Sequence, residues 1–377
     1  MATSGKVKFG TGLKIKQVGR MDLPGGGLVA VENGYAYVGH MDPPYGTSIV
    51  DVRDPKHPKL VSQLEVPEGI HSHKVRVSGD VMLVNYERYK SNQEAQGGLK
   101  IFDISNKAKP REIAFFKAGG RGVHRFTFDG RYAYISPCIE GYVGNIAMIL
   151  DLKDPARPQE AGRWWMPGQW IGGGETPAWE GTAHRCHHPI RRGNRLYVSY
   201  WHGGFVILDI SDMSKPKLVS HLDWSPPYPA PTHTTLPMPW KIMERDIMVV
   251  TDEEAQKLAP KPLAFLWIVD ITEETRPIPI STFMLPDDSA PGPDDRFGAH
   301  QPAEQVRGTT LYVTWFSGGL RAIDISNPYL PTEVGFYVPL PGRGQKTVQS
   351  NDVYHREDGL LFLIDRFDGL EILESEL

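Results

Sequence analysis

The segment LKIFDISNKAKP, at residues 99–110, decides the fold, because five other segments of the chain follow its pattern. In each copy an apolar run ends in an aspartate, and a proline follows seven residues later. The other copies are SIVDVRDPKHP (48–58), AMILDLKDPARP (147–158), FVILDISDMSKP (205–216), LWIVDITEETRP (266–277) and LRAIDISNPYLP (320–331). Successive aspartates lie 52, 48, 58, 61 and 54 residues apart. A sequence repeat with a period of about 50 residues predicts a fold built from repeated structural units.

Each repeat unit contains four short apolar runs separated by turn residues, with no long helical pattern. Such a unit predicts one four-stranded antiparallel blade of an all-β propeller. The C-terminal stretch at 351–374 supplies three strands, and residues 12–23 resemble the outer strands of the other units. We therefore expect residues 12–23 to complete the last blade and to close a seven-bladed ring. Residues 1–377 are then a single propeller domain, without exposed sheet edges.

The composition narrows the classes of function. The chain has 377 residues, 40% of them hydrophobic, and a formal net charge of −4. Without a basic surface or a long apolar run, nucleic acid and membrane are not expected partners. The N-terminus has no apolar core of a secretory signal, and two cysteines do not form a disulfide framework. These features favour a cytoplasmic protein.

The strings GGLKIFDIS (97–105) and GGLRAIDIS (318–326) resemble LVIVD-repeat proteins. This resemblance extends over nearly the whole chain. It implies a β-propeller but no particular activity, because that family has no single function.

Histidine recurs at one position of successive repeat units. His73, His124 and His187 each precede a glycine by six residues, and His300 precedes one by eight. His233 begins the corresponding stretch of another unit, and Asn351 takes the His300 position in the last unit. In a propeller these positions belong to the innermost strands, at the central channel. The pattern therefore predicts that five histidines gather at one end of the channel.

Neutral imidazoles that converge on one space are suited to hold a transition metal. We predict that the metal ligands are His73, His124, His187, His233 and His300, and that Fe(II) is preferred to Zn or Mn. Carotenoid-cleaving dioxygenases, which are also seven-bladed propellers, hold iron with four channel histidines. The sequence is similar to them in that arrangement alone. The alternative is that these histidines bond to backbone groups and water.

Two long loops, at about residues 163–186 and 223–240, contain most of the tryptophans. An aromatic wall around an apolar or aromatic substrate is expected there, although the same residues suit a subunit contact. The predicted substrate-binding residues are Trp164, Trp165, Trp170, Trp179, Trp224, Tyr228 and Asn351. The predicted catalytic residues are His71, His188 and Glu180. A raised carboxyl pKa among the aromatics would suit Glu175 or Glu180 as a proton carrier.

These features favour a metal-dependent enzyme, a non-haem oxidoreductase that oxidises or cleaves a small apolar or aromatic molecule. A hydrolase or lyase, dependent on the metal or on a histidine base, is one alternative. A non-enzymatic propeller that binds a partner protein is the other. The sequence leaves open whether the chain forms a homo-oligomer.

Overall fold

A computed structural model describes residues 6–89, 95–179, 181–225, 227–255, 262–292, 295–342 and 344–377. The chain divides into two compact units. We call residues 1–29, 54–58 and 224–377 the N/C unit, and residues 30–53 and 59–223 the central unit.

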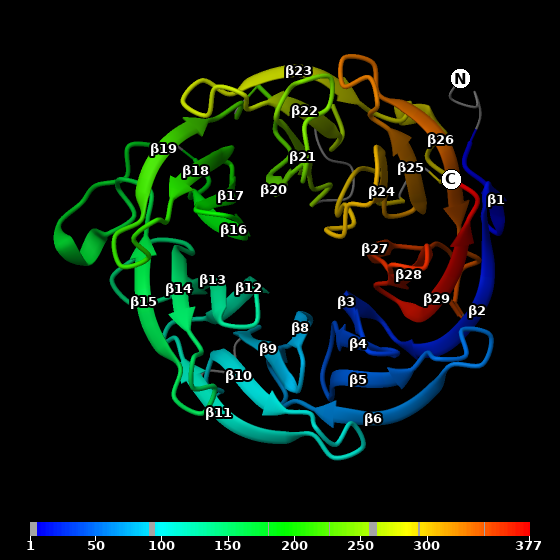
Figure 1. The fold of residues 1–377 in the computed structure, drawn as a ribbon, viewed down its shortest axis with the longest axis horizontal. Helices are drawn as coiled ribbons and strands as arrows, with labels where there is room; N and C mark the ends of the chain where they lie inside the picture. The colour runs from blue at the N-terminus through cyan, green and yellow to red at the C-terminus, as the bar shows by residue number, and fades with distance from the viewer. Residues whose placement is uncertain are drawn as a thin grey trace. The chain divides into compact units, whose positions relative to one another are not determined.

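The N/C unit contains three four-stranded antiparallel sheets, whose strands lie side by side in Figure 1. The first has the order β20 (Thr232–Pro237), β21 (Ile247–Asp252), β22 (Leu266–Asp270) and β23 (Ile278–Phe283). The second has the order β1 (Thr11–Leu13), β26 (Thr332–Val338), β25 (Leu320–Asp324) and β24 (Thr310–Thr314). The third has the order β2 (Ile15–Pro24), β29 (Asp368–Ser375), β28 (Leu360–Asp365) and β27 (Ser350–His355).

The central unit contains most of one four-stranded sheet and the whole of another. Their orders are β3 (Gly26–Glu32), β4 (Tyr35–His40), β5 (Tyr45–Asp51), β6 (Lys59–Glu65), and β16 (Arg185–Arg192), β17 (Arg195–Trp201), β18 (Phe205–Asp209), β19 (Lys217–Leu222).

A nine-stranded sheet completes the central unit. Its main path runs β11 (Arg111–Lys117), β10 (Gly98–Asp103), β9 (Val81–Arg88), β12 (Gly122–Phe128), β13 (Tyr132–Cys138), β14 (Ala147–Asp151), β15 (Gln159–Trp164), and β7 (Ile70–His71) and β8 (Val75–Ser78) pair with β9. One residue pair, Gly122 with Glu87, joins β12 to β9. On either side of this pair, consecutive strands are antiparallel neighbours as in the other sheets.

The repeat of the sequence is visible in these sheets. The repeat aspartates end the third strands, and each accepts a hydrogen bond at 2.8–3.1 Å from the backbone N–H two residues later; they are Asp51, Asp103, Asp151, Asp209, Asp270 and Asp324. An aspartate in this position favours the turn that follows. The fold is an all-β propeller with four-stranded antiparallel blades.

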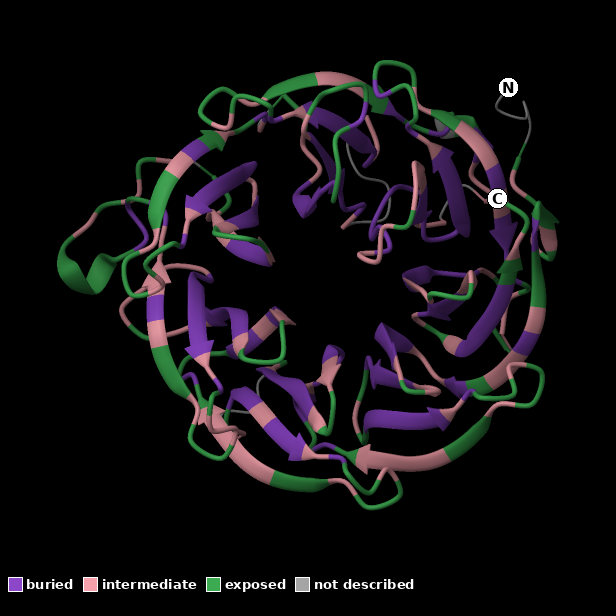
Figure 2. Ribbon diagram, viewed as in Figure 1, coloured by how far each residue is buried: buried purple, intermediate pink, exposed green. Residues whose placement is uncertain are grey.

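Burial follows the position of a strand in its blade. Third strands such as β14 and β18 are buried along almost their whole length, whereas outer strands such as β6 and β11 are partly exposed (Figure 2). A strand packed on both faces is expected to be apolar throughout, which explains the continuous apolar run in each repeat. The buried side chains form cores such as the cluster around Leu99, Val123 and Phe126.

The N-terminal segment pairs differently from the expectation at its first residues. β2 pairs with β29 from Ile15 to Pro24, but residues 11–13 form β1 and pair with β26 in another sheet. Lys14 has a φ of 57°, so the strand cannot continue regularly through it.

Helix is scarce in the described parts of the chain, where η1 (Ile171–Gly173) and η2 (Asp287–Ser289) are single 3₁₀ turns. None of the described helices is long and apolar enough to cross a membrane.

Candidate metal centre

The predicted histidine positions lie where the inner strands are irregular. The register of β12 shifts between Val123 and Phe126, that of β16 between Cys186 and Pro189, and that of β20 between Thr232 and Thr234. His124, His187 and His233 fall inside these bulges. A β-bulge re-aims the side chain it carries, and bulges are frequent beside functional sites. His73 lies in the gap between β7 and β8.

Four histidines of the central unit are neighbours, and we call His71, His73, His124 and His187 the central cluster. The rings of His71 and His73 stack with centroids 3.7 Å apart. The His124 ring lies 5.2 Å from that of His73 and 5.0 Å from that of His187. The structure thus brings together three predicted ligands and one predicted catalytic residue in this unit.

Two residues of the central cluster are held through Nδ1. The Nδ1–H of His124 donates to Oε2 of Glu87 at 2.6 Å, and the Nδ1–H of His71 donates to the backbone oxygen of Met41 at 2.6 Å. Carboxylate and carbonyl oxygens only accept, so Nδ1 carries the proton in both rings. The neutral ring then has its lone pair on Nε2, the atom that ligates a metal.

Glu87 is a buried carboxylate that accepts hydrogen bonds from the side chains of His124 and Arg121. Its Oε1 accepts a hydrogen bond from Nη2 of Arg121 at 3.1 Å. Burial alone would raise the pKa of Glu87, but His124, His71 and Arg121 outweigh it and hold that pKa at about 2. Glu87 therefore stays ionised under ordinary conditions and keeps its acceptor role toward His124.

The distance between two ring nitrogens decides what the central cluster fits. Nε2 of His124 lies 3.2 Å from Nε2 of His187. Two imidazole nitrogens bound tetrahedrally to one zinc ion, each at about 2.0–2.1 Å, lie roughly 3.3 Å apart. The same separation also suits a direct hydrogen bond between the rings. His187 further stacks on Trp201, with centroids 5.5 Å apart.

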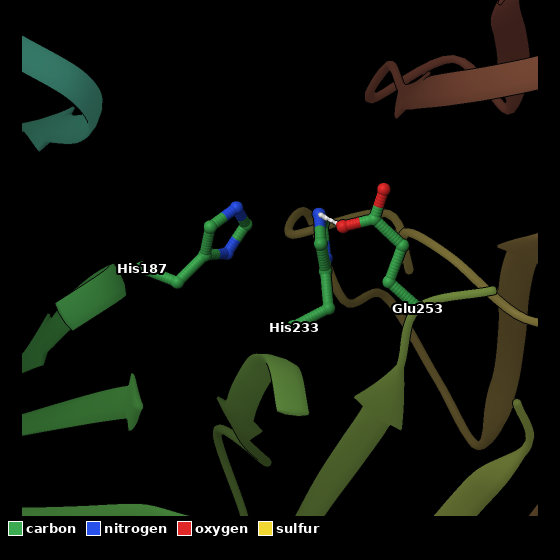
Figure 3. A group of neighbouring side chains, drawn as sticks. All are labelled: His187, His233 and Glu253. Carbon is green, nitrogen blue, oxygen red and sulfur yellow. Dashed lines mark ion pairs between the residues drawn. The ribbon is translucent and has the colours of Figure 1, made fainter. Parts of the chain in front are cut away.

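The N/C unit has a second group, His233, His300 and Glu253, which we call the N/C cluster. The His233 and His300 rings have centroids 4.2 Å apart. Nε2 of His233 lies 3.9 Å from Oε2 of Glu253, the ion pair drawn in Figure 3, and Nε2 of His300 lies 3.9 Å from Oε1. Arg296 also pairs with Oε1 of Glu253, at 2.8 Å.

The N/C histidines are anchored through Nδ1 in the same way as His71 and His124. The Nδ1–H of His300 donates to the backbone oxygen of Asn351 at 2.5 Å. The hydroxyl of Thr234 donates to Gln301, so its oxygen accepts from the Nδ1–H of His233 at 2.8 Å. Both Nε2 lone pairs therefore lie near the Glu253 carboxylate. A cation among these atoms would remove the repulsion between them.

Glu87 and Glu253 are not among the predicted site residues, although the sequence contains a pattern that points to them. Both follow an aspartate by seven residues in matching second strands, DVMLVNYE (80–87) and DIMVVTDE (246–253). The matching positions of other blades also contact inner-strand histidines or Asn351. The backbone oxygen of Met41 accepts from His71, the Phe316 ring lies tilted against that of His300 with centroids 4.7 Å apart, and Arg366 donates to Asn351 at 3.1 Å.

The other predicted residues have varied surroundings. His188 is fully buried beside His187, and its backbone N–H donates to Ser199. The amide of Asn351 donates to the backbone oxygen of Gly27 at 2.7 Å, so this side chain holds the inner strands in place. Glu180 lies outside the described residues.

The tryptophans of the loop at 163–186 contact other residues of the central unit. Trp165 donates from Nε1 to Glu175 at 3.1 Å, and its ring lies 5.5 Å from that of Trp170. Trp164 packs edge-on against Tyr200, and Trp179 stacks on His184. The raised pKa expected for Glu175 is wrong, because the hydrogen bond from Trp165 lowers that pKa.

The loop at 223–240 covers a buried carboxylate. Trp224 stacks on Trp267 with centroids 4.5 Å apart, and Tyr228 packs edge-on against Trp267 at 4.8 Å. Nε1 of Trp267 donates to Asp252 at 2.8 Å. Burial raises the pKa of Asp252 to about 7, although the hydrogen bonds from Trp267, Thr232 and Trp224 lower it.

Two pockets lie elsewhere in the N/C unit, with volumes of about 230 and 570 Å³. Arg321 lines the smaller one, and Arg20 and Glu371 line the larger one. The predicted ligands and aromatic residues line neither of these two pockets.

Comparison with protein families agrees with the repeat seen in the sequence. A family model of the LVIVD repeat matches residues 27–66, 94–117, 192–223 and 305–338. The chain contains LVIVD repeats. No curated protein matches the sequence significantly.

Solved structures share the fold of this chain at very low sequence identity. The WD40 repeats of RRP9 align with a TM-score of 0.64 and 9% identity, over 96% of this chain and 97% of that one. U3-55K aligns with a TM-score of 0.62 and 9% identity, over 96% and 98%. A chain of the Mitotic Checkpoint Complex aligns with a TM-score of 0.60 and 12% identity, over 99% and 93%. These similarities concern the propeller fold alone.

Proposed function

We propose that this propeller binds a divalent transition metal through histidines of its inner strands. The observation that carries the proposal is shared by His71, His124, His233 and His300. Each donates its Nδ1–H to a fixed acceptor and so presents Nε2 as a lone-pair donor. Metal-binding histidines in proteins are commonly oriented through this hydrogen bond on the other ring nitrogen.

Within the central cluster, His124 and His187 are the proposed ligands, because their Nε2 atoms have the separation that one ion requires. His73 is the proposed third ligand, with His71 beside it. In the N/C cluster we propose His233 and His300. That all five predicted ligands hold a single ion stays a prediction.

The choice of metal is also a proposal. Imidazole suits Fe, Zn and Mn among others, and we retain Fe(II) as the first choice. A bound ion with an open position would supply either O2-dependent oxidation or an activated water, according to its identity. A small apolar or aromatic organic substrate remains proposed for that case, as do roles for His71, His188 and the loop tryptophans.

A protein-binding scaffold is the second candidate, and the comparisons support it better than they support an enzyme. The specific observation is the full-length likeness to the WD40 repeats of RRP9 and to a chain of the Mitotic Checkpoint Complex. Metal binding is compatible with this alternative, because a metal can stabilise a fold as well as catalyse a reaction.

The blade number and the location of the protein are proposals as well. We propose seven blades, because residues 70–164 contain the strands of two blades joined through one residue pair. Pairing of β2 with β29 would close such a ring. We also propose a cytoplasmic location, since Cys138 and Cys186 both have free thiols.

Elemental analysis of untagged protein tests the metal proposal. We expect about one transition-metal ion per chain in the wild type, and its loss from the folded His124→Ala variant. His57→Ala is the matched control, because the His57 side chain is 75% exposed and pairs only with nearby Asp54 among the described residues. Folded wild-type protein that takes up neither Fe(II) nor Zn, even under anaerobic conditions, would overturn the proposal. Capture of a defined partner by that metal-free protein would then establish the scaffold.

A further inference from the structure

The smaller pocket of the N/C unit has features of a ligand site unrelated to the histidines. Strands β25 and β26 contribute Arg321, Glu333 and Phe336 to its lining. The rest of the lining comes from residues 6–8, Thr11, Leu285, Pro286 and Ser289, and the backbone N–H of Val7 donates to the backbone oxygen of Ser289 at 2.8 Å. We call this space, of about 230 Å³, the Arg321 pocket.

Arg321 is a buried cation in this pocket. The residue is only 4% exposed. Its Nη1 donates to Oε1 of Glu333 at 3.1 Å, and its Cζ lies 5.1 Å from the centre of the Phe336 ring, opposite it in the β25–β26 pairing. Glu333 thus neutralises the charge of the guanidinium, and the Phe336 ring covers one of its faces.

The remaining edge of the Arg321 guanidinium, formed by Nε and Nη2, has no such neighbour among the described residues. Nε and Nη2 of Arg321 are buried and have no hydrogen-bond partner among the described residues. These two nitrogens lie on the same edge of the planar group, where their N–H bonds point in parallel. That edge matches the two oxygens of a carboxylate in a bidentate pair. Leaving such donors buried and unsatisfied costs free energy, which a ligand would offset.

The propeller repeat itself does not require a cation at this position. Arg321 lies three residues before the repeat aspartate, where other copies have Ser48, Met148, Val206 and Trp267. Lys100 has the same position in its copy, but it pairs with the partly exposed Glu112 at 2.8 Å. Arg321 is therefore explained by its own surroundings rather than by the repeat.

We propose that the Arg321 pocket binds a small carboxylic acid with an apolar body. The carboxylate would displace the side chains that bury Nε and Nη2 of Arg321 and pair with these two nitrogens, and Leu285 and Pro286 would contact the body of the ligand. The exposed Lys6 and Lys8, which also line the pocket, favour an anion over a neutral molecule. The apolar part of the lining, which is formed by Val7, Leu285, Pro286 and Phe336, favours an organic acid over an inorganic anion.

Benzoate is a suitable first probe, measured by calorimetry and by thermal shift on the full chain. We expect benzoate to bind and to raise the melting temperature. The neutral isostere benzamide and the inorganic anion sulfate should bind at least about tenfold more weakly. Arg321→Met should lose benzoate binding, and Lys100→Met should keep it.

Two further variants test the proposal if Arg321→Met does not fold. The double variant Arg321→Met with Glu333→Gln removes both charges together, so neither is left buried alone. Arg321→Lys keeps the charge but lacks the two-donor edge, and it should bind benzoate more weakly than the wild type. The proposal would be overturned if benzamide or sulfate bound as tightly as benzoate. It would also be overturned if the double variant still bound benzoate, or if the folded wild type did not bind benzoate. None of these results depends on a bound metal.

Discussion

Glu87 is the residue whose replacement tests the metal proposal most sharply. Glu87 is not a proposed metal ligand, but it accepts the Nδ1–H of His124, whose Nε2 is the proposed metal-binding atom. In Glu87→Gln the amide oxygen can still accept this hydrogen bond, so the ring orientation is expected to persist while the negative charge is lost. Arg121 loses its partner, but its side chain is 54% exposed and remains solvated. The variant should therefore fold normally.

The size of the effect follows from the geometry. A carboxylate about 6 Å from a divalent ion stabilises it by about 5.5 kcal/mol at an effective dielectric constant of about 20. Arg121 offsets part of this attraction, because it pairs with the same carboxylate. Removing such partners of metal-binding histidines typically weakens binding by about 10- to 100-fold. We expect the lower half of that range, a loss of about 1.4–2 kcal/mol.

The assay is a competition titration of Zn²⁺ against a chelating indicator at neutral pH, with circular dichroism to verify folding. Glu112→Gln is the matched control, because it also removes an ion-paired glutamate of the central unit and should leave the affinity unchanged. An affinity of folded Glu87→Gln within twofold of wild type would refute the reasoning, as would an equal loss in the control.

Two further predictions concern the fold. Gly25→Ala should destabilise the protein by about 3 kcal/mol, because the new Cβ would lie 1.7 Å from the backbone oxygen of Arg366, whereas Gly308→Ala has open space; equal melting temperatures of the two variants would contradict this. The pKa of Asp103 is lowered to about 2, first by hydrogen bonds from Ser105 and then by an arginine. Because this pKa is depressed on folding, its stabilisation is present above about pH 4 and is lost as the pH falls toward 2. The melting temperature of Asp103→Ala should accordingly lie below that of the wild type at pH 7, and the two should converge near pH 2. A difference in melting temperature that does not change with pH would contradict a stabilising role of the ionised Asp103 carboxylate.

The blade architecture was predictable because it is set by local interactions. An apolar run, an aspartate and a proline define a buried strand and the turn after it within about twelve residues, and the six aspartates all make the same backbone hydrogen bond. The bounds of the N-terminal strands were not predictable to the residue. Whether Leu13 pairs with Phe336 or continues toward β29 depends on the backbone of Lys14 and on two distant strands.

The candidate site was only partly predictable. The spacing of histidines to glycines indicated His124 and His187, which lie in β12 and β16, since that spacing is a property of each repeat. It also indicated His73 and His300, which lie outside the strands of the described residues. It did not indicate the carboxylates, because Glu87 lies in β9 and contacts His124 of β12, 37 residues away in the chain. The aromatic loops were misleading in one respect, since a carboxylate among tryptophans accepts a hydrogen bond there, which lowers its pKa.

The sequence by itself determined the repeat, the antiparallel blade and the positions that carry histidine, because each depends on residues close together in the chain. Only the tertiary structure decided which ring nitrogens are held by hydrogen bonds, which carboxylates accompany them, and that Arg321 has two buried donors beside a pocket. These properties arise between strands that are distant in sequence, where distance, burial and charge are set by packing rather than by local preference.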